Sequence, residues 1–343
     1  MNTEELERTA AEIVADGKGI LAADESTGTM DKRLKAVMDE PTPDARRKFR
    51  ELMFTTEGAS DHIAGAILFD ETIRQETGDG KPFVELLSEQ GIVPGIKVDT
   101  GAKPLAGSPD EKVTEGLDGL CDRLEEYHEL GARFAKWRAV ITIGDGIPTD
   151  YCIDVNAHAL ARYAALCQEA GIVPIVEPEV LMDGTHTIDT SDEVTTRTLR
   201  GVFAELAAQR VALEGILLKP NMVLAAYDCP DQAGAEEVAA RTVACLRRAV
   251  PAAVPGIVFL SGGQADEQAT ENLNAINKVD PQPWVLSFSY GRALQQSALK
   301  AWAGEEAKAS DAQTAYAQRA ALTGAASRGE YSEEMERELA PAG

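Results

Sequence analysis

The chain has 343 residues, of which 44% are hydrophobic and 26% charged, enough to bury the core of one large barrel or of two ordinary domains. Its net charge of −24 at pH 7 argues against nucleic acid and membranes as partners. The acidic N-terminus without a signal peptide, the lack of any apolar run near the ~18 residues of a membrane span, and five scattered cysteines predict a protein of the reducing cytoplasm.

Eight short apolar runs recur along the chain. Each is rich in Ile, Val, Leu or Phe and flanked by Gly or Pro, which is typical of fully buried parallel strands. The eight runs are Ile20–Ala23, Ala66–Phe69, Val93–Val98, Phe134–Arg138, Val173–Glu177, Ile216–Lys219, Ile257–Ser261 and Val285–Ser289.

Amphipathic helical patterns fill the gaps between these runs. They cover Asp44–Thr55, Val113–Leu130, Tyr151–Ala170, Asp192–Leu213 and Ala233–Val250. A strand followed by a helix, repeated eight times, predicts an α/β fold of the (β/α)8 TIM barrel type. A doubly wound sheet is the alternative, but no GxGxxG follows the first run and no GxxxxGK[ST] occurs anywhere.

The chain changes character after Ala301. Ser310–Leu322 has the composition of one more alanine-rich helix, whereas residues 323–343 are polar and charged without apolar periodicity. We therefore expect a single barrel domain over residues 1–322, with an N-terminal and a C-terminal helix, and a flexible polar tail over residues 323–343.

Seven of the eight runs end in charged or hydroxyl-bearing residues, where a barrel places its reactive groups. A charge at one strand end is ordinary solvation, but seven together indicate an anionic-substrate site with acid–base chemistry. These residues are Asp24, Lys97, Lys136, Arg138, Glu177, Glu179, Lys219, Ser261, Gly262, Gly263, Ser289 and Arg292. Alternation along a strand predicts that Lys136 and Arg138 share one face, as do Glu177 and Glu179.

Lys219 is the strongest candidate for a nucleophile. It follows the apolar residues Ile216–Leu218, and desolvation together with a nearby cation such as Lys136 disfavours its ammonium form. A Schiff-base nucleophile requires the neutral amine. The structural alternative is a lysine that reaches the rim or pairs with Glu177.

Glu177 and Glu179 flank Pro178 at the end of the fifth run. Imine formation needs several proton transfers, for which a carboxyl group beside a lysine is suited. The two carboxylates could equally be ion-pair acceptors for Lys136 and Arg138, and such pairs would also tune the acid.

Two groups of residues predict anion sites on opposite sides of the barrel mouth. Ser261-Gly262-Gly263 offers backbone N–H groups and a hydroxyl, and Arg292 follows the next strand. Lys97, with Ser26 and Thr29, forms the second group, after the first and third runs. Two such sites indicate a substrate with a phosphate at each end.

Eight segments resemble class I fructose-1,6-bisphosphate aldolases, over residues 12 to 303. They are GKGILAADESTG (17–28), GIKVD (95–99), FAKWR (134–138), GIVPIVEPE (171–179), LLKPNMV (217–223), FLSGGQ (259–264), LNAINK (273–278) and FSYGRAL (288–294). The resemblance implies reversible cleavage of fructose 1,6-bisphosphate to dihydroxyacetone phosphate and glyceraldehyde 3-phosphate, without a cofactor or metal, in a cytoplasmic homotetramer of glycolysis and gluconeogenesis.

The resemblance also implies a role for each matching residue. Lys219 would form the imine, with Glu177 as the main proton shuttle and Glu179 and Lys136 beside it. Asp24 would take part in cleavage, and Arg138 would hold the substrate. The C1-phosphate site would comprise Ser261, Gly262, Gly291 and Arg292, with Ser289 nearby. The C6-phosphate site would comprise Ser26, Thr29 and Lys97, although many relatives have Ser where this chain has Thr29.

The end of the chain departs from the vertebrate-type pattern, in which a terminal tyrosine helps to protonate the eneamine. This chain ends in Gly343, and its last tyrosine is Tyr331. We therefore expect Glu177 or water to serve, with a slower or differently limited final step. Proton exchange at the pro-chiral position of dihydroxyacetone phosphate measures that step, and a rate equal to that of tyrosine-tailed relatives would contradict the expectation.

Three other functions remain to be distinguished. A metal-dependent class II aldolase is disfavoured because the four histidines form no cluster in the sequence. A transaldolase or a deoxyribose-phosphate aldolase shares the lysine chemistry but does not need two anion sites. A scaffold that binds filaments is disfavoured by the net charge of −24.

Overall fold

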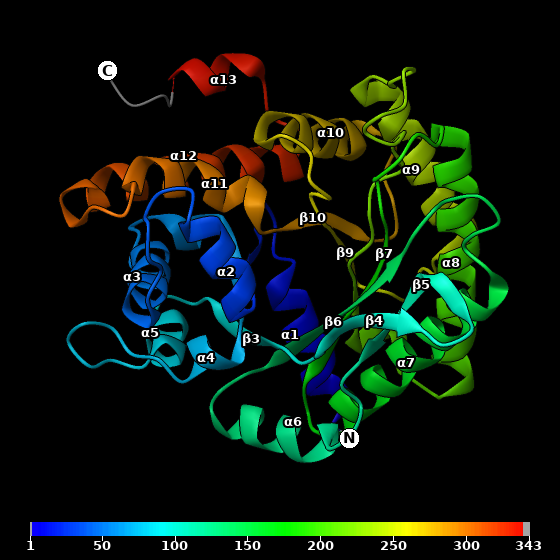
Figure 1. The fold of residues 1–343 in the computed structure, drawn as a ribbon, viewed down its shortest axis with the longest axis horizontal. Helices are drawn as coiled ribbons and strands as arrows, with labels where there is room; N and C mark the ends of the chain where they lie inside the picture. Colours follow the sequence, from blue (N-terminus) through cyan, green and yellow to red (C-terminus); the bar gives the residue numbers. More distant parts are fainter. Residues whose placement is uncertain (1, 339–343) are drawn as a thin grey trace.

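The computed structural model describes residues 2–338, and its centre is a closed barrel of eight parallel strands (Figure 1). The strand order around the barrel is β1-β10-β9-β8-β7-β6-β3-β2. The strands are β1 Gly19–Ala23, β2 Ile63–Leu68, β3 Val93–Lys97, β6 Phe134–Ile141, β7 Val173–Val180, β8 Leu217–Leu218, β9 Gly256–Phe259 and β10 Val285–Tyr290. Each overlaps one of the eight predicted runs, so the (β/α)8 barrel is confirmed, although β2 begins three residues before the expected Ala66.

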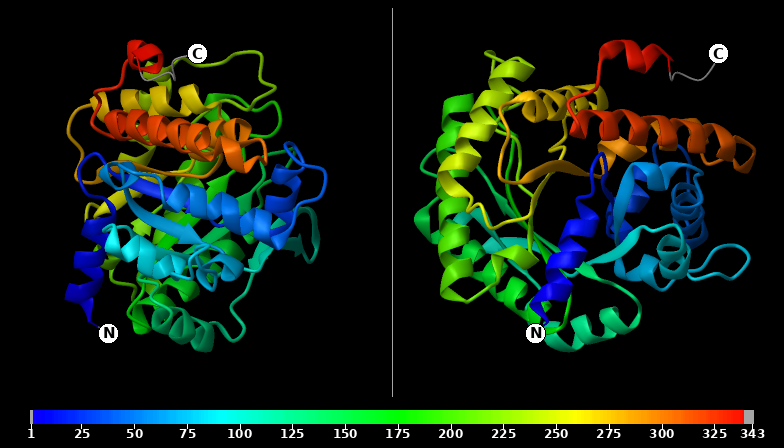
Figure 2. Two further views of the ribbon diagram at one scale, coloured as in Figure 1. Left: turned by 90° about the vertical axis from the view of Figure 1, so that its left-hand side faces the viewer. Right: turned by 180° about the vertical axis from the view of Figure 1, so that it is seen from behind.

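Helices surround the barrel and follow the strands in the chain (Figure 2). Their bounds are α1 Thr3–Ile13, α2 Thr27–Leu34, α3 Pro43–Phe54, α4 Asp70–Ile73, α5 Phe83–Glu89, α6 Leu120–Glu129, α7 Asp150–Glu169, α8 Ile188–Ala208, α9 Ala235–Ala249, α10 Asp266–Lys278, α11 Arg292–Trp302, α12 Ala309–Ser327 and α13 Glu333–Glu338. Short 3-10 turns occupy η1 Ala59–Asp61, η2 Leu213–Gly215 and η3 Glu306–Lys308. A large apolar core lies between strands and helices.

The inside of the barrel is filled by its own apolar side chains. Ile20, Phe134 and Leu217 belong to this cluster and are fully buried. Leu6 and Ile13 of α1 belong to the same cluster, so the first helix closes one end of the barrel. Chemistry is therefore confined to the other end, where the strands finish.

A two-stranded hairpin beside the barrel was not predicted. It comprises β4 Gly101–Leu105 and β5 Ser108–Glu115, which pair antiparallel. The helix expected over Val113–Leu130 is therefore wrong at its start, and α6 begins at Leu120 after Gly119 in a left-handed conformation. The buried residues of β5 include Glu111, whose carboxylate accepts hydrogen bonds from Thr149. The strand therefore lacks the alternation of apolar and polar residues by which a half-buried strand is predicted.

Two helices end at other residues than predicted. Helix α8 stops at Ala208 instead of Leu213, because Arg210 adopts φ 61°, a left-handed conformation that ends a helix. Helix α12 runs to Ser327, five residues beyond the expected end at Leu322.

Part of the expected tail packs against the barrel domain. Tyr331 is 6% exposed, and Glu336 of α13 forms an ion pair of 2.6 Å with Arg319 of α12. Residues 323–327 thus continue α12, and α13 contacts α12 through Glu336. Residues 339–343 of the expected tail lie outside the described residues. Within residues 2–338, no helix is both long and apolar enough to span a membrane.

A substitution at Gly95 in β3 tests how closely the barrel interior is packed. A Cβ at this position would clash with the Phe134 ring, which the barrel encloses. Gly95→Ala is expected to lower the free energy of unfolding by about 1–3 kcal/mol, the usual cost of overpacking a core. Urea denaturation measures this. Gly28→Ala, with open space around its Cβ, is the control, and equal stabilities of the two variants would contradict the packing described.

Candidate active site

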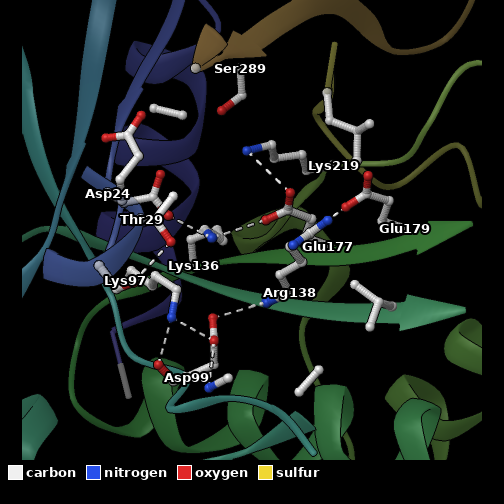
Figure 3. Close-up of a pocket in the computed structure, with 18 of the residues that line it drawn as sticks. Asp24, Thr29, Lys97, Asp99, Lys136, Arg138, Glu177, Glu179, Lys219 and Ser289 are labelled. Carbon is white, nitrogen blue, oxygen red and sulfur yellow. Dashed lines mark hydrogen bonds and ion pairs between the residues drawn. The ribbon is translucent and has the colours of Figure 1, made fainter. Parts of the chain in front are cut away.

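A cavity of about 1040 Å³ opens at the carboxyl ends of the barrel strands. Every residue that the sequence predicted for the site lines it, and Figure 3 shows many of their side chains pointing into the same space. They are Asp24, Ser26, Thr29, Lys97, Lys136, Arg138, Glu177, Glu179, Lys219, Ser261, Gly262, Ser289, Gly291 and Arg292. Residues separated by more than 250 positions in the chain thus form one site.

Lys219 lies immediately after β8, deep in this cavity. Its backbone N–H donates to the carbonyl of Val176 at 2.8 Å, which continues the pairing of β8 with β7. The side chain is 4% exposed, and Nζ lies 3.3 Å from Oε1 of Glu177. The amine is therefore held at the bottom of the cavity with a carboxylate at ion-pair distance.

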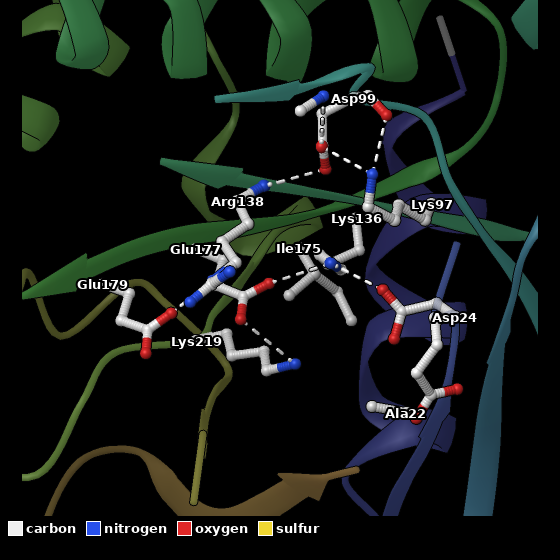
Figure 4. Close-up of polar contacts among 12 residues, drawn as sticks. Ala22, Asp24, Lys97, Asp99, Lys136, Arg138, Ile175, Glu177, Glu179 and Lys219 are labelled. Atoms are coloured by element: carbon white, nitrogen blue, oxygen red, sulfur yellow. Dashed lines mark hydrogen bonds and ion pairs between the residues drawn. The ribbon is translucent and has the colours of Figure 1, made fainter. Parts of the chain in front are cut away.

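Glu177 lies between two lysines (Figure 4). Oε1 faces Lys219, and Oε2 lies 3.3 Å from Nζ of Lys136. Among the described residues Oε2 has no partner with hydrogen-bond geometry, although it is fully buried. A carboxyl group placed between two amines can exchange a proton with a group bound to Lys219.

Lys136 and Asp24 form a buried ion pair, 2.6 Å between Nζ and Oδ2. Burial raises the pKa of Asp24, but the combined effect of Lys136, Lys219 and Lys97 is larger and lowers it. The pKa of Asp24 therefore lies well below its usual value. Burial lowers the pKa of Lys136, and Asp24, Glu177 and Asp99 raise it above its usual value. Asp24 is therefore an anion and Lys136 a cation at neutral pH.

Arg138 and Glu179 form a second pair nearer the mouth, with Nε donating to Oε2. Burial lowers the pKa of Arg138, but Glu179, Glu177 and Asp99 raise it above its usual value. Lys136 and Arg138 line the same cavity, as do Glu177 and Glu179, so the predicted sharing of one face is confirmed. The alternative that the sequence left open, ion pairing of these groups, is also present.

The glycine loop after β9 has the geometry of an anion site. Gly262 and Gly263 have φ of +58° and +89°, which glycine adopts without strain. Arg292 begins α11 in the neighbouring loop, and Gly291 before it lies so close to β1 that a Cβ would be 3.2 Å from the Ala22 carbonyl oxygen. The glycine loop and the guanidinium group of Arg292 thus line the same cavity.

The second predicted anion site has its hydroxyl groups in place but its lysine turned aside. Ser26 Oγ and Thr29 Oγ1 lie 3.1 Å apart at the start of α2. Lys97 Nζ instead donates to Oδ1 and to the carbonyl oxygen of Asp99, at 2.6 and 2.8 Å. A phosphate at this site would compete with Asp99 for the ammonium group.

Asp99 is the first residue that sequence reasoning missed. Besides Lys97, it accepts hydrogen bonds from the backbone N–H groups of Gly101 and Arg138, at 3.1 and 3.3 Å. Its side chain is 3% exposed. The signal was available, because Asp99 follows Lys97 by two positions, the period of a strand face.

Glu25 is the second missed residue. It follows Asp24, accepts hydrogen bonds from Arg33 and Arg50, and receives a third from Nε2 of Gln295 at 3.0 Å. Burial raises the pKa of Glu25, but Arg50 and Arg33 lower it below its usual value. Pairing partners as distant as Gln295 leave no local pattern, so this network was beyond sequence analysis.

These features define a class: lysine-dependent lyases built on a (β/α)8 barrel, with a buried amine and a carboxylate at the strand ends. Residues 5–342 match the family description "Fructose-bisphosphate aldolase class-I". The chain belongs to the class I fructose-bisphosphate aldolase family, which is the Schiff-base aldolase family of glycolysis.

Relatives agree on this assignment over most of the chain. A probable fructose-bisphosphate aldolase class 1 of Xylella fastidiosa is 62% identical over 302 residues, 88% of this chain and 90% of the relative. The cytosolic fructose-bisphosphate aldolase 4 of Arabidopsis thaliana is 53% identical, covering 96% and 84%. A solved structure of fructose-bisphosphate aldolase from Plasmodium falciparum superimposes with a TM-score of 0.95 at 49% identity, covering 96% of each chain.

The Asp24–Lys136 pair yields a prediction about stability and pH. Asp24→Asn is expected to lower the free energy of unfolding at pH 7 by about 3 kcal/mol. This is the lower end of the range for a broken buried ion pair, because Lys136 still has Glu177 as a partner in the variant. A lowered pKa stabilises the fold above the unfolded value of about 4, and this contribution is lost as pH falls through the folded value.

Urea denaturation at pH 7 and at decreasing pH measures this effect. The difference between the variant and the unsubstituted protein should be constant near neutrality and shrink below about pH 4. The exposed residue Asp16, changed to Asn, is the matched control. A difference that grows as the solution is acidified would contradict the charge assignment.

Proposed function

We propose that this chain catalyses reversible aldol cleavage of fructose 1,6-bisphosphate to dihydroxyacetone phosphate and glyceraldehyde 3-phosphate, through a Schiff base on Lys219. The observation that carries the proposal is the position of Lys219 Nζ, 3.3 Å from Glu177 inside the cavity, with anion-binding groups on both sides of the mouth. Membership of the family supports the substrate.

The first half of the reaction builds the imine. The neutral amine of Lys219 attacks the C2 carbonyl of the sugar, and the oxygen becomes the hydroxyl of a carbinolamine. Glu177, at ion-pair distance from Nζ, donates the proton with which that hydroxyl leaves as water. Lys136 stabilises the resulting carboxylate through its 3.3 Å contact with Oε2.

The second half breaks the C3–C4 bond. A carboxylate removes the proton of the C4 hydroxyl, C4 becomes the aldehyde, and the electron pair of the broken bond passes to the iminium as an eneamine. Asp24 is suited as the group that receives or orients this proton, because Lys136 holds it as an anion. Protonation at C3 by Glu177 or water, followed by hydrolysis, releases the ketone and restores Lys219.

The remaining residues hold the substrate. Ser261, Gly262, Gly291 and Arg292, with Ser289 beside them, bind the C1-phosphate, and Ser26, Thr29 and Lys97 bind the C6-phosphate. Arg138 and its partner Glu179 border the sugar between the two phosphates. The separation of the two sites selects a substrate with a phosphate at each end.

We also infer that the protein is a cytoplasmic homo-oligomer, a tetramer. A cytosolic relative in Arabidopsis thaliana, 53% identical, supports the location. Light scattering coupled to size-exclusion chromatography measures the mass, and a value of one 36.7 kDa chain would contradict the oligomer.

Trapping of the intermediate tests the function. The protein is incubated with dihydroxyacetone phosphate and borohydride in the presence of a chelator, and the modified peptide is located by mass. We expect a reduced adduct on Lys219. In Lys219→Arg the adduct should be absent and the activity should fall at least 1000-fold, because an arginine cannot form the imine. Lys103→Arg, an exposed lysine in the hairpin, is the matched control.

Other outcomes would redraw the proposal. An adduct on Lys136 or Lys97 keeps the class of enzyme but moves the nucleophile. Absence of an adduct, with activity lost in chelator, overturns the proposal in favour of a metal-dependent aldolase. Equal turnover of substrates with one and two phosphates would favour a different Schiff-base barrel enzyme.

A further inference from the structure

A tyrosine outside the expected site lies on the glycine loop. Tyr227 belongs to the irregular segment after β8 and lines the cavity next to Gly263. Its hydroxyl donates a hydrogen bond to the backbone carbonyl of Gly262. A Cβ on Gly263 would lie 2.8 Å from the hydroxyl oxygen, so Tyr227 packs directly on the backbone of this loop.

The backbone of Tyr227 is anchored, which gives the hydroxyl a defined position. The N–H of Tyr227 donates to the Met182 carbonyl at 3.0 Å, and the N–H of Asp228 donates to the Gly184 carbonyl at 3.1 Å. The segment after β8 is thereby tied to the segment after β7. Tyr227 therefore reaches across from one strand end to the loop that follows β9.

The bond to the Gly262 carbonyl also fixes the neighbouring donor. In a trans peptide the carbonyl oxygen and the following N–H lie in one plane and point in opposite directions. Tyr227 holds the oxygen of the 262–263 peptide, and so sets the direction of the Gly263 N–H. Within residues 2–338, the N–H groups of Gly262 and Gly263 donate to no protein acceptor. Two such free donors in a row form an anion-binding concavity.

We infer that Tyr227 is a positioning residue that confers specificity for a phosphorylated ketone. It holds the peptide between Gly262 and Gly263 in place, so that the N–H groups of these two residues bind a phosphate. This phosphate is the one next to the carbonyl that reacts with Lys219. This inference rests on the proposed function for the assignment of that phosphate as the one on C1. Arg292 supplies the charge of the same site, and Tyr227 supplies its geometry.

The protonation state of Tyr227 is compatible with this role. Burial raises the pKa of Tyr227 to about 12, against the opposing effect of Arg292. The hydroxyl therefore keeps its proton throughout the neutral range and donates it to the carbonyl. A phenolate at this position would instead repel a phosphate.

Tyr227→Phe tests the inference, because it keeps the ring and removes the hydroxyl. We expect KM for fructose 1,6-bisphosphate to rise about fivefold, the effect of one hydrogen bond, with the loss falling on KM rather than on kcat. The ratio of borohydride-trapping rates, dihydroxyacetone phosphate over dihydroxyacetone, should fall about fivefold. Tyr151→Phe, a tyrosine of α7 that is 49% exposed and outside the cavity, should keep both values and is the control.

Each other result is decisive. An unchanged KM and ratio in Tyr227→Phe would overturn the inference while leaving the aldolase function standing, and so would an equal loss for both ketones. If the unsubstituted protein traps neither ketone, the proposed function fails on its own. Titration with inorganic phosphate then decides: about fivefold weaker binding to Tyr227→Phe supports the positioning role, and equal binding overturns it.

Discussion

The site depends on one constraint, a row of four ionisable side chains packed inside the barrel mouth. The row is Asp24, Lys136, Glu177 and Lys219, in which carboxyl groups alternate with amines at distances of 2.6, 3.3 and 3.3 Å. A lone ionisable group at this depth would be costly to bury, whereas each of these has a neighbour of the opposite kind. The row runs from the end of β1 across β6 and β7 to the end of β8, so strands from the whole first two thirds of the chain contribute to it.

The same balance extends to the whole cavity. Seven Lys or Arg residues and seven Asp or Glu residues line it, whereas the chain as a whole has 33 basic and 57 acidic residues. The cations of a strongly acidic protein are thus concentrated where a phosphorylated ligand would bind. The acidic remainder of the surface repels such a ligand, which leaves the cavity as the favoured place of encounter.

The sequence was most informative where burial is simplest. Continuous apolar runs identify parallel strands that are covered on both faces, and the charges at their ends follow from barrel geometry. The β4–β5 hairpin escaped detection because its buried residues include Glu111, and Arg210 ends α8 by a backbone conformation that no periodicity announces. Glu25 and Tyr227 escaped for another reason: their partners are distant in the chain or are backbone atoms. Periodicity reports which face a residue occupies, and it carries no information about such pairings.

The pairing of the first strand with the last has a consequence for synthesis of the chain. Ile20 of β1 pairs with Ser289 of β10, so the barrel cannot close until nearly the whole chain has left the ribosome. Until then β1 and β9, the two strands that β10 joins, are open sheet edges, and α1 lacks the complete interior that it covers. A chain shortened before β10 would keep Lys136, Glu177 and Lys219 but would lack both the strand that closes the barrel and Arg292 of the anion site.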